Sequence, residues 1–371
     1  MASNRSIDPT VRSEGRLASR AVTWLEDNAV LLVTVGLLLA LPFIIAVLDG
    51  QSIAGMVANE PGNSKFIQGL MIEIFILAVF AISYDLVFGF TGLLSFGHAM
   101  FFAVGAYLTG VLLKTFGWPL LPTLGMVVVV GILQALIFSI VLPRVHGVTF
   151  ALVTLGMAEV FDIIIRTREL ADYTGAEVGL QGIPQPEFLN PATERLNVYM
   201  VALGFAVLVY LIYRRFVESP TGRVCIAIRE NEDRAKMLGY NTFYFKLAAL
   251  VVASVTAALA GTMNALYKPI VSPEIATMGY TVDALLIILI GGIGTLSGAM
   301  IGAGVYRLLD FYLLRWFGET GSYLLGAVYV ALVLFVPYGI IGTWRQRSFR
   351  IKEGWQRLLG LLGFRGRTPA A

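Results

Sequence analysis

Residues 89–107 are Gly89-Phe-Thr-Gly92-Leu-Leu-Ser95-Phe-Gly97-His98-Ala-Met-Phe-Phe-Ala-Val-Gly-Ala-Tyr107. Apolar runs flank this stretch, yet it carries four glycines with a serine and a histidine between them. Glycine lets two backbones pack closely, and it also permits a break in a helix. A broken backbone at membrane depth is tolerated only where it is buried in protein or lines a wet cavity. The stretch therefore predicts either close helix packing or a helix break along a translocation path.

A similar stretch occurs much later in the chain, from Gly291 to Met300, and reads Gly-Gly-Ile-Gly-Thr-Leu-Ser-Gly-Ala-Met. Both copies contain Gly-x-x-Gly-x-x-Ser followed by Ala-Met, with a register that slips by a few residues. Many transporters are built from paired halves whose glycine-interrupted segments meet at the substrate path. We therefore predict an internal repeat. The predicted path residues at the two helix breaks are Gly89, Gly92, Ser95, Gly97, His98, Gly291, Gly294, Ser297 and Gly298.

The composition is that of a membrane protein. Of the 371 residues, 57% are apolar and only 14% are charged, whereas soluble domains are roughly half apolar and a quarter charged. The single cysteine, Cys225, excludes an internal disulfide and a cysteine metal cluster, and two histidines argue against a histidine metal site. The sequence contains no Gly-x-x-x-x-Gly-Lys-Ser/Thr phosphate-binding loop. We therefore predict no metal and no bound cofactor, and no ATP hydrolysis by that route.

Apolar runs predict the membrane spans, with soft boundaries because several are shorter than the ~20 residues of a straight span. Eight of these runs each predict one span, and a long ninth run, 280–316, predicts one long helix or two short ones around the Gly291–Gly298 break. The eight runs are 29–48, 66–88, 99–113, 120–142, 148–165, 198–213, 247–267 and 323–341.

The distribution of lysine and arginine predicts the topology. Residues 1–28, the loop 214–246 and the tail 344–371 are rich in these residues, and basic loops face the cytoplasm. The loop and the tail share a side only if the run 280–316 forms two spans, which gives ten spans with both ends inside. This count places both glycine breaks near the cytoplasmic side, so that the repeat is parallel; a re-entrant turn would instead make it inverted. Labelling at Thr174 from outside, and at Ser348 only from inside, would test this topology.

Ionisable residues within predicted spans are candidate functional groups. Glu73 is the deepest carboxylate, and we predict that it faces the path. Three aspartates, Asp85, Asp162 and Asp283, lie near span ends, where they can touch water. Arg307 and Asp310 are three residues apart on one helical face and can neutralise each other.

The external loop 166–197 is acidic and rich in glycine and proline. A solvated connector is one interpretation, and a docking surface for an external protein is the other, because long ordered loops are usually functional. The predicted docking residues are Thr174, Gly175, Gly179, Gly182 and Pro184.

The basic loop 214–246, which we call the coupling loop, predicts two short helices. Residues 219–222 predict a turn and 224–229 a helix; Asn231 is a suitable cap for a second helix, which Gly239 ends. We interpret this loop as a docking element for another protein, and a plain charged connector is the alternative interpretation. The tail 344–371 alternates basic and apolar residues, as in an amphipathic helix on the anionic inner leaflet.

Several of these segments together resemble the LivM-type permease of branched-chain amino-acid ABC importers. The resemblance covers about residues 80–305 and rests on segments that occur in order and with sensible spacing. These are residues 92–107, Thr174-Gly175 with 179–184, Pro220-Thr-Gly-Arg with 227–230 and Leu238-Gly239, Ser272-Pro-Glu274, and 291–298.

The resemblance implies an all-α permease subunit in the bacterial inner membrane that forms half of a path for branched-chain or related neutral amino acids. It implies a LivH-like second permease, two cytoplasmic ATPases that hold ATP and magnesium, and a periplasmic substrate-binding protein, with no nucleic acid partner. Ala235-x-x-x-Gly239 matches the ABC coupling motif, whereas Glu232 stands one residue further from Ala235 than in that motif. The implied coupling residues are Arg229, Glu230, Glu232, Ala235, Leu238 and Gly239.

Two alternatives remain at this stage. A urea or short-amide ABC importer subunit shares the same construction. An autonomous secondary transporter or channel would need ion-coupling carboxylates but no coupling loop, and proton-dependent uptake by the isolated chain would favour it.

Overall fold

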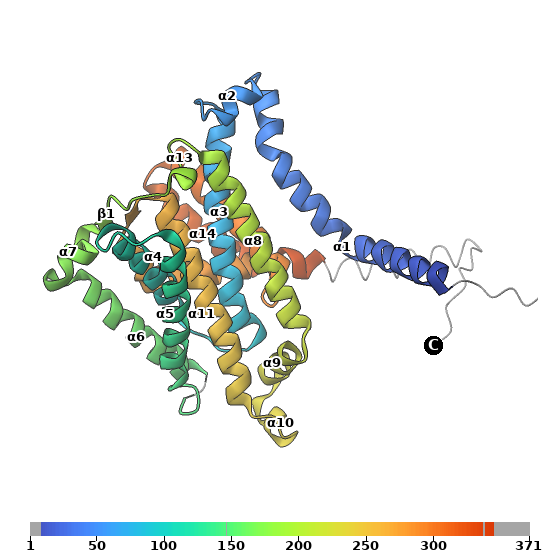
Figure 1. Ribbon diagram of the computed structural model, residues 1–371. Helices are drawn as coiled ribbons and strands as arrows, with labels where there is room; N and C mark the ends of the chain where they lie inside the picture. Colours follow the sequence, from blue (N-terminus) through green and yellow to red (C-terminus); the bar gives the residue numbers. More distant parts are fainter. Residues whose placement is uncertain (1–8, 146, 337, 345–371) are drawn as a thin grey trace, which may run out of the picture. The chain divides into compact units, whose positions relative to one another are not determined.

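Helices account for most of the chain in the computed structural model, which describes residues 9–145, 147–336 and 338–344 (Figure 1). The chain divides into two compact units, residues 1–67 and 68–371. Most of the predicted tail, 345–371, including the labelling position Ser348, lies outside the described residues, as do residues 1–8.

The first unit holds α1 (Pro9–Leu48), α2 (Ile53–Val57) and the start of α3 (Asn63–Asp85). Helix α1 continues from the predicted N-terminal segment 1–28 into the first predicted span, and its membrane-spanning part is residues 28–48. Ser64 donates a hydrogen bond of 2.9 Å to the carbonyl of Pro42, which ties the beginning of α3 to α1.

The second unit is the helical domain that carries both glycine stretches. Its longer helices are α4 (His98–Lys114), α5 (Leu120–Ser139), α6 (Val148–Arg166), α8 (Arg195–Glu218), α9 (Pro220–Glu230), α11 (Thr242–Tyr267), α12 (Met278–Gly291), α13 (Leu296–Phe317) and α14 (Thr320–Phe335). Its short elements are η1 (Leu86–Phe90), η2 (Arg168–Leu170), α7 (Ala171–Thr174), η3 (Ala176–Val178), η4 (Glu187–Leu189), α10 (Glu232–Met237), η5 (Pro273–Ala276) and the antiparallel strands β1 (Leu180–Gln181) and β2 (Ile270–Val271).

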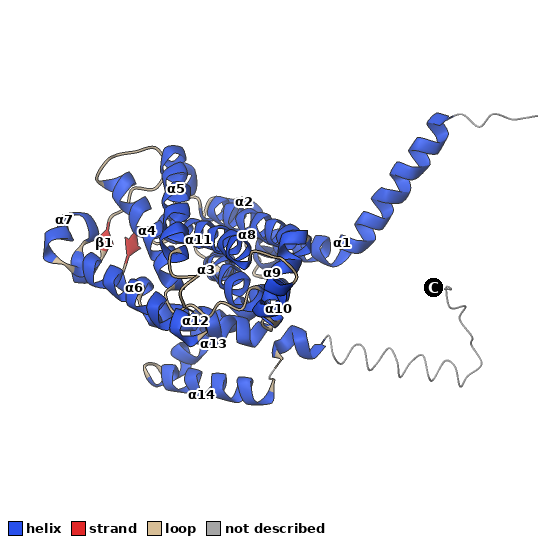
Figure 2. Ribbon diagram, turned by 90° about the horizontal axis from the view of Figure 1, so that it is seen from below, coloured by secondary structure: helices blue, strands red, loops and turns tan. Residues whose placement is uncertain are grey.

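The core of this unit forms where α4 packs against α11, with α5 beside both (Figure 2). Small residues allow the close approach. A Cβ atom on Gly105 would lie 1.9 Å from the carbonyl oxygen of Ala258, and one on Gly261 would lie 1.9 Å from that of Phe102. At Gly105, therefore, the glycine of the first stretch serves helix packing.

The all-α polytopic membrane fold is confirmed. Six described helices are long and apolar enough to cross a membrane, and a seventh span is added if α12 and α13 count as one. These two helices are bent by 112° at residues 292–295, so the run 280–316 forms two short helices rather than one long helix. With the shorter apolar helices α4 and α14, each of the ten predicted spans contains a helix.

Candidate functional site

The second glycine break lies against the helix end that leads into the first. The first break, residues 91–97, follows η1, and the second break, residues 292–295, joins α12 to α13. The backbone N–H of Gly294 donates to Oδ1 of Asp85 over 2.8 Å. A Cβ atom on Gly89 would lie 2.7 Å from the same nitrogen. The second break therefore lies beside the end of α3 and η1, from which the first break continues.

The turn chemistry explains why glycine stands at these positions. Gly92 has φ +76° and Gly294 has φ +72°, a backbone conformation that residues with a side chain rarely adopt. Just before Gly92 the chain forms the π-helix η1, and single π-helical turns occur frequently at functional sites. Each break is thus a defined turn.

The two serines of the repeat do not occupy equivalent places. Ser95 lies within the first break and is buried, whereas Ser297 lies in the first turn of α13 and is exposed. The first break is longer, and this accounts for the slip in register between the two copies.

Three further predicted path residues lie at close backbone contacts. A Cβ atom on Gly97 would lie 2.2 Å from the carbonyl oxygen of Thr154, and Gly291 and Gly298 approach so closely that a Cβ on Gly291 would lie 1.9 Å from the oxygen of Gly298. These positions show the close packing that the sequence offered as one interpretation. Their role in a path stays a prediction.

His98 is completely buried at the first residue of α4. Its Nε2 atom shares a 2.8 Å hydrogen bond with the hydroxyl of Ser83. The rings of Phe80, Tyr84 and Phe101 surround it, with centroids 5.1–5.6 Å away.

Beside His98, three rings from three helices form what we call the aromatic layer, residues Phe80, Phe102 and Tyr280. Their centroids are 5.0–5.1 Å apart in each pair. Phe80 and Phe102 are fully buried. The layer closes the space between α3, α4 and α12 with apolar atoms.

The coupling loop contains the two helices predicted for it, but the first is longer. Residues 219–222 are not a separate turn: Ser219 accepts a hydrogen bond of 3.2 Å from the N–H of Gly222 and caps α9, with Pro220 in the first helical turn. Asn231 caps α10 through the N–H of Arg234 at 2.8 Å, as predicted. Gly239, with φ +88°, follows the end of α10.

The coupling loop contacts the first break directly through Arg229. The Nη1 atom of Arg229 donates a hydrogen bond to the carbonyl oxygen of Gly89. A Cβ on Gly92 would lie 3.2 Å from the Cα of Arg229, and a Cβ on Gly294 would lie 2.8 Å from its Nη1. Residues of the first break and the coupling loop also share a cavity of about 80 Å³. Arg229 on α9 therefore lies beside glycines of both stretches.

Glu232 makes its contacts with other residues of this chain. It forms ion pairs with Lys236 at 3.2 Å and with Lys246 at 2.5 Å, and it accepts a hydrogen bond of 3.0 Å from Thr242. Burial alone raises the pKa of the Glu232 carboxyl, but Lys246, Thr242 and Lys236 outweigh it and lower this pKa to about 2. Glu232 is therefore ionised at neutral pH and fastens α10 to the start of α11.

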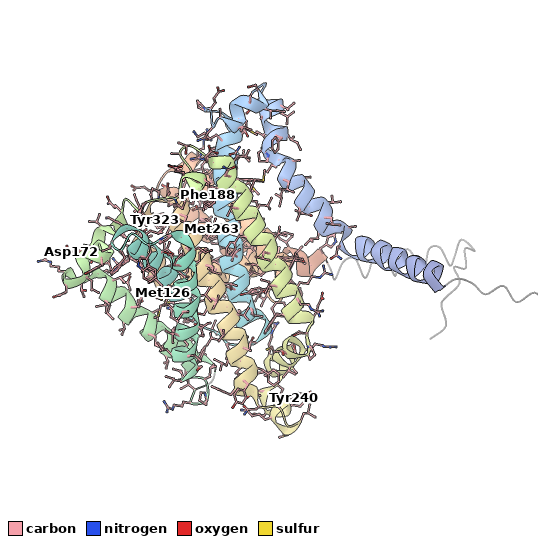
Figure 3. All side chains as sticks on the ribbon, in the orientation of Figure 1. Met126, Asp172, Phe188, Tyr240, Met263 and Tyr323 are labelled. Atoms are coloured by element: carbon pink, nitrogen blue, oxygen red, sulfur yellow. The ribbon has the colours of Figure 1, made fainter. Side chains whose placement is uncertain are left out.

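Ala235 does not offer a surface for close approach of another protein, because it is buried in the chain, with 3% exposure. Its neighbours Met237 and Leu238 are 86% and 72% exposed. Tyr240 and Tyr244 are exposed as well, and Figure 3 shows Tyr240 at the tip of the coupling loop. We call these four residues the apolar tip. Glu230 is exposed at the end of α9, beside Arg229.

The external loop 166–197 is fastened to the helical domain. Thr174 is buried and donates a 2.7 Å hydrogen bond to the carbonyl of Ile165, while Gly175 and Gly179 pack so closely that a Cβ on Gly175 would lie 2.0 Å from the oxygen of Gly179. Strand β1 pairs with β2 immediately after α11. Gly182 and Pro184 are exposed, and so are Asp172 and Phe188, both labelled in Figure 3. Thr174 is thus a poor labelling position, and the exposed part of the loop carries other residues.

Charged residues gather around a second cavity, of about 190 Å³, between α3, α11, α12 and α13. Arg307 forms ion pairs with both Glu73 and Asp310, so the predicted neutralisation of Asp310 is confirmed and extends to Glu73. Lys268 lies 3.0 Å from Glu73. Since an ionised residue at the centre of a membrane helix costs about 3 kcal/mol on insertion scales, this pairing offsets a large cost.

Among the three aspartates expected to touch water, Asp85 is fully buried, contrary to that expectation. Asp283 is half-buried and lines the charged cavity, and Asp162 bonds Arg166 at 2.8 Å. Asp85 is the site residue that the sequence analysis missed. Its position four residues before Gly89, one helical turn away, is the signal that could have identified it.

These features define a class of protein. The chain forms a helical membrane domain with two glycine breaks close to each other, and a pair of capped helices on its surface contacts one of them. This is the construction of a transport permease.

The comparisons with known proteins name the family. A family model for the permease component of branched-chain amino acid transport systems matches residues 66–337, and the chain belongs to this family. It is 28% identical over 306 residues to the high-affinity branched-chain amino acid permease LivM of Salmonella typhimurium, covering 75% of this chain and 70% of that one. It is 27% identical over 312 residues to a probable LivM of Methanocaldococcus jannaschii, covering 71% and 89%. It is 26% identical over 289 residues to LivH of Escherichia coli K12, covering 71% and 91%. No solved structure matches the chain.

Proposed function

We propose that this chain forms half of the path through which an ATP-driven importer carries branched-chain amino acids across the bacterial inner membrane. Its membership of the permease family supports this role, as do relatives named for high-affinity branched-chain amino acid transport. The chain also resembles LivH, which supports pairing with a second, related permease. The other proposed partners are a periplasmic binding protein, two ATPases that hold ATP and magnesium, and the surrounding lipid.

The observation that carries the mechanism is the bond from Arg229 on α9 to the carbonyl of Gly89. Closure of the ATPases moves the coupling loop, and Arg229 passes that movement to the first break. The second break moves together with the first, because the N–H of Gly294 is hydrogen-bonded to Asp85, one helical turn before Gly89. The ATPases can shift the permease between two arrangements only if they contact one arrangement more favourably than the other. The hydrogen bond from Arg229 to Gly89 is the proposed point at which this difference reaches the helix breaks.

Uptake tests the function. A strain deleted for its own branched-chain uptake systems, expressing this chain with its neighbouring genes, is expected to accumulate labelled leucine, isoleucine and valine. Accumulation requires intact ATPases. Uptake of urea or short amides in place of amino acids would assign the chain to that other type of importer, and proton-driven uptake by the isolated chain would contradict ATP coupling.

Replacement of Arg229 tests the link. The Arg229→Ala variant is expected to lower uptake about tenfold or more, because a hydrogen bond from a charged donor contributes about 1.5–3 kcal/mol. Stimulation of ATP hydrolysis by the binding protein is expected to persist, so that transport per ATP falls. Arg223→Ala, an exposed arginine on the same helix, is the matched control and should leave transport near wild type. Unchanged transport per ATP in Arg229→Ala would contradict the assignment.

Thiol labelling tests the proposed sidedness, with both ends of the chain inside. In a Cys225→Ala background, Asp172→Cys is expected to react from outside, and Met237→Cys only after permeabilisation, because basic loops face the cytoplasm. Both positions are exposed. Labelling of Met237→Cys in intact cells would reverse the orientation.

A further inference from the structure

We propose that the charged cavity between α3, α11, α12 and α13 binds one amino acid in its zwitterionic form, as a transit site within the chain. This inference rests on the proposed function and adds a substrate site to it. Five of the residues that line the cavity are charged, and the other five are two aliphatic residues, two tyrosines and an asparagine.

The charges of the cavity suit a ligand that carries both signs. Its lining includes the carboxylates of Glu73, Asp283 and Asp310, and the cations of Lys268 and Arg307. Arg307 is held between Glu73 and Asp310. Asp283 accepts a hydrogen bond from the hydroxyl of Tyr306, and no ion pair within 4.0 Å joins it to a cation in the described part of the chain. Its remaining acceptor positions are therefore open to the ammonium of a ligand.

The cation for the ligand carboxylate is Lys268. Its side chain is 50% exposed and has one ion pair in the described ranges, the 3.0 Å contact with Glu73. A lysine is flexible and has three N–H donors, so Lys268 can bind a ligand carboxylate in the cavity while it still contacts Glu73. Glu73 also remains paired with Arg307. Asp283 and Lys268 thus offer one group of each sign, and the lining as a whole disfavours ligands with a net negative charge.

The size and walls of the cavity select a small aliphatic amino acid. A volume of about 190 Å³ is below the ~300 Å³ at which sites for drug-sized ligands begin. It therefore fits a single amino acid and excludes a peptide. Ile76, Leu77 and the rings of Tyr280 and Tyr306 provide apolar walls for the side chain.

The position of the cavity places it on the way to the breaks. Lys246, beside the first break, is near the start of α11, and Lys268 directly follows its end. Their separation of 22 residues corresponds to roughly 33 Å along the helix. Tyr280 belongs both to the cavity wall and to the aromatic layer. An amino acid in the cavity therefore sits at the end of α11 opposite the first break, beside the aromatic layer.

Protection of a cysteine in the cavity tests the proposal. The full-length chain with Cys225→Ala and Leu77→Cys, in lipid nanodiscs without binding protein, is treated with a small neutral thiol reagent. L-leucine at about ten times its dissociation constant is expected to slow the reaction about tenfold. Leucinamide, which lacks the carboxylate, and 4-methylpentanoate, which lacks the ammonium, are expected to protect much less.

Further variants make the test specific. Asn264→Cys, on α11, is a second reporter in the cavity lining and is used if Leu77→Cys is poorly produced. Asp172→Cys on the external loop should show no protection. Asp283→Asn should remove protection by leucine, whereas Asp162→Asn, which changes a carboxylate outside the cavity, should retain it.

The outcomes separate this proposal from the proposed function. Wild-type leucine uptake by the complete importer together with no protection of either reporter would overturn the transit site and leave the function standing. Equal protection by leucine and by either analogue would overturn a zwitterion site. Protection by leucine alone supports the site, even if the importer fails to accumulate branched-chain amino acids, and in that case the function is what fails.

Discussion

Replacing both Met237 and Leu238 by glutamate is expected to abolish ATP-driven uptake while the chain still reaches the membrane. The two side chains are the most exposed part of the apolar tip. Apolar anchors that enter a groove on another protein supply much of the binding energy of such contacts. Together the two contribute roughly 3 kcal/mol or more, about a hundredfold in affinity. The measurements are leucine uptake and pull-down of the ATPase subunits.

The control is Asp233→Ala, because Asp233 is 86% exposed on the same helix and makes only a 3.8 Å contact with Lys236. It should bind the ATPases as the wild type does. If the double glutamate variant also retains pull-down and uptake, the coupling loop is a charged connector and not a docking element. Ala235→Glu is a poor test of docking, since it would bury a charge inside the chain and destabilise the loop itself.

The Gly291→Ala variant is expected to lose more than nine-tenths of uptake. Its Cβ would lie 1.9 Å from the carbonyl oxygen and 2.3 Å from the carbonyl carbon of Gly298, and both are backbone atoms that cannot rotate away. Overpacking of this kind costs about 1–3 kcal/mol, and here the strain falls on the bend between α12 and α13. Uptake is measured per molecule of protein in the membrane, together with its thermal stability.

Gly304→Ala is the matched control on α13. The nearest atom to its Cβ is a methyl carbon of Ile74 at 4.0 Å, so the substitution is accommodated. It should transport near the wild-type rate. Comparable uptake by the two variants would show that the second break tolerates a side chain and that Gly291 is only a spacer.

The sequence predicts the elements of this fold better than their contacts. Apolar periods and charge placement predict the helices, and even the division at residues 292–295, because each is a local property of the chain. The capping of α10 by Asn231 is equally local, since donor and acceptor lie three residues apart. The start of α9 was predicted wrongly because Ser219-Pro220 suits a turn and a helix cap alike.

The candidate site depends on contacts between distant residues, and these follow only from the structure. Asp85 and Gly294 are 209 residues apart, and Arg229 and Gly89 are 140 apart. Nothing local separates Ala235, which is buried, from Met237, which is exposed, because that difference depends on how α10 packs. The same holds for Thr174, whose hydroxyl satisfies the carbonyl of Ile165 instead of facing outward.

The aromatic layer has an electrical consequence. Rings of Phe80, Phe102 and Tyr280 place a zone of low polarity beside the charged cavity, and such a zone favours passage of a substrate without net charge. Moving one elementary charge through 100 mV involves about 2.3 kcal/mol, but a zwitterion has no net charge and does no such work. Voltage therefore neither drives nor opposes its passage.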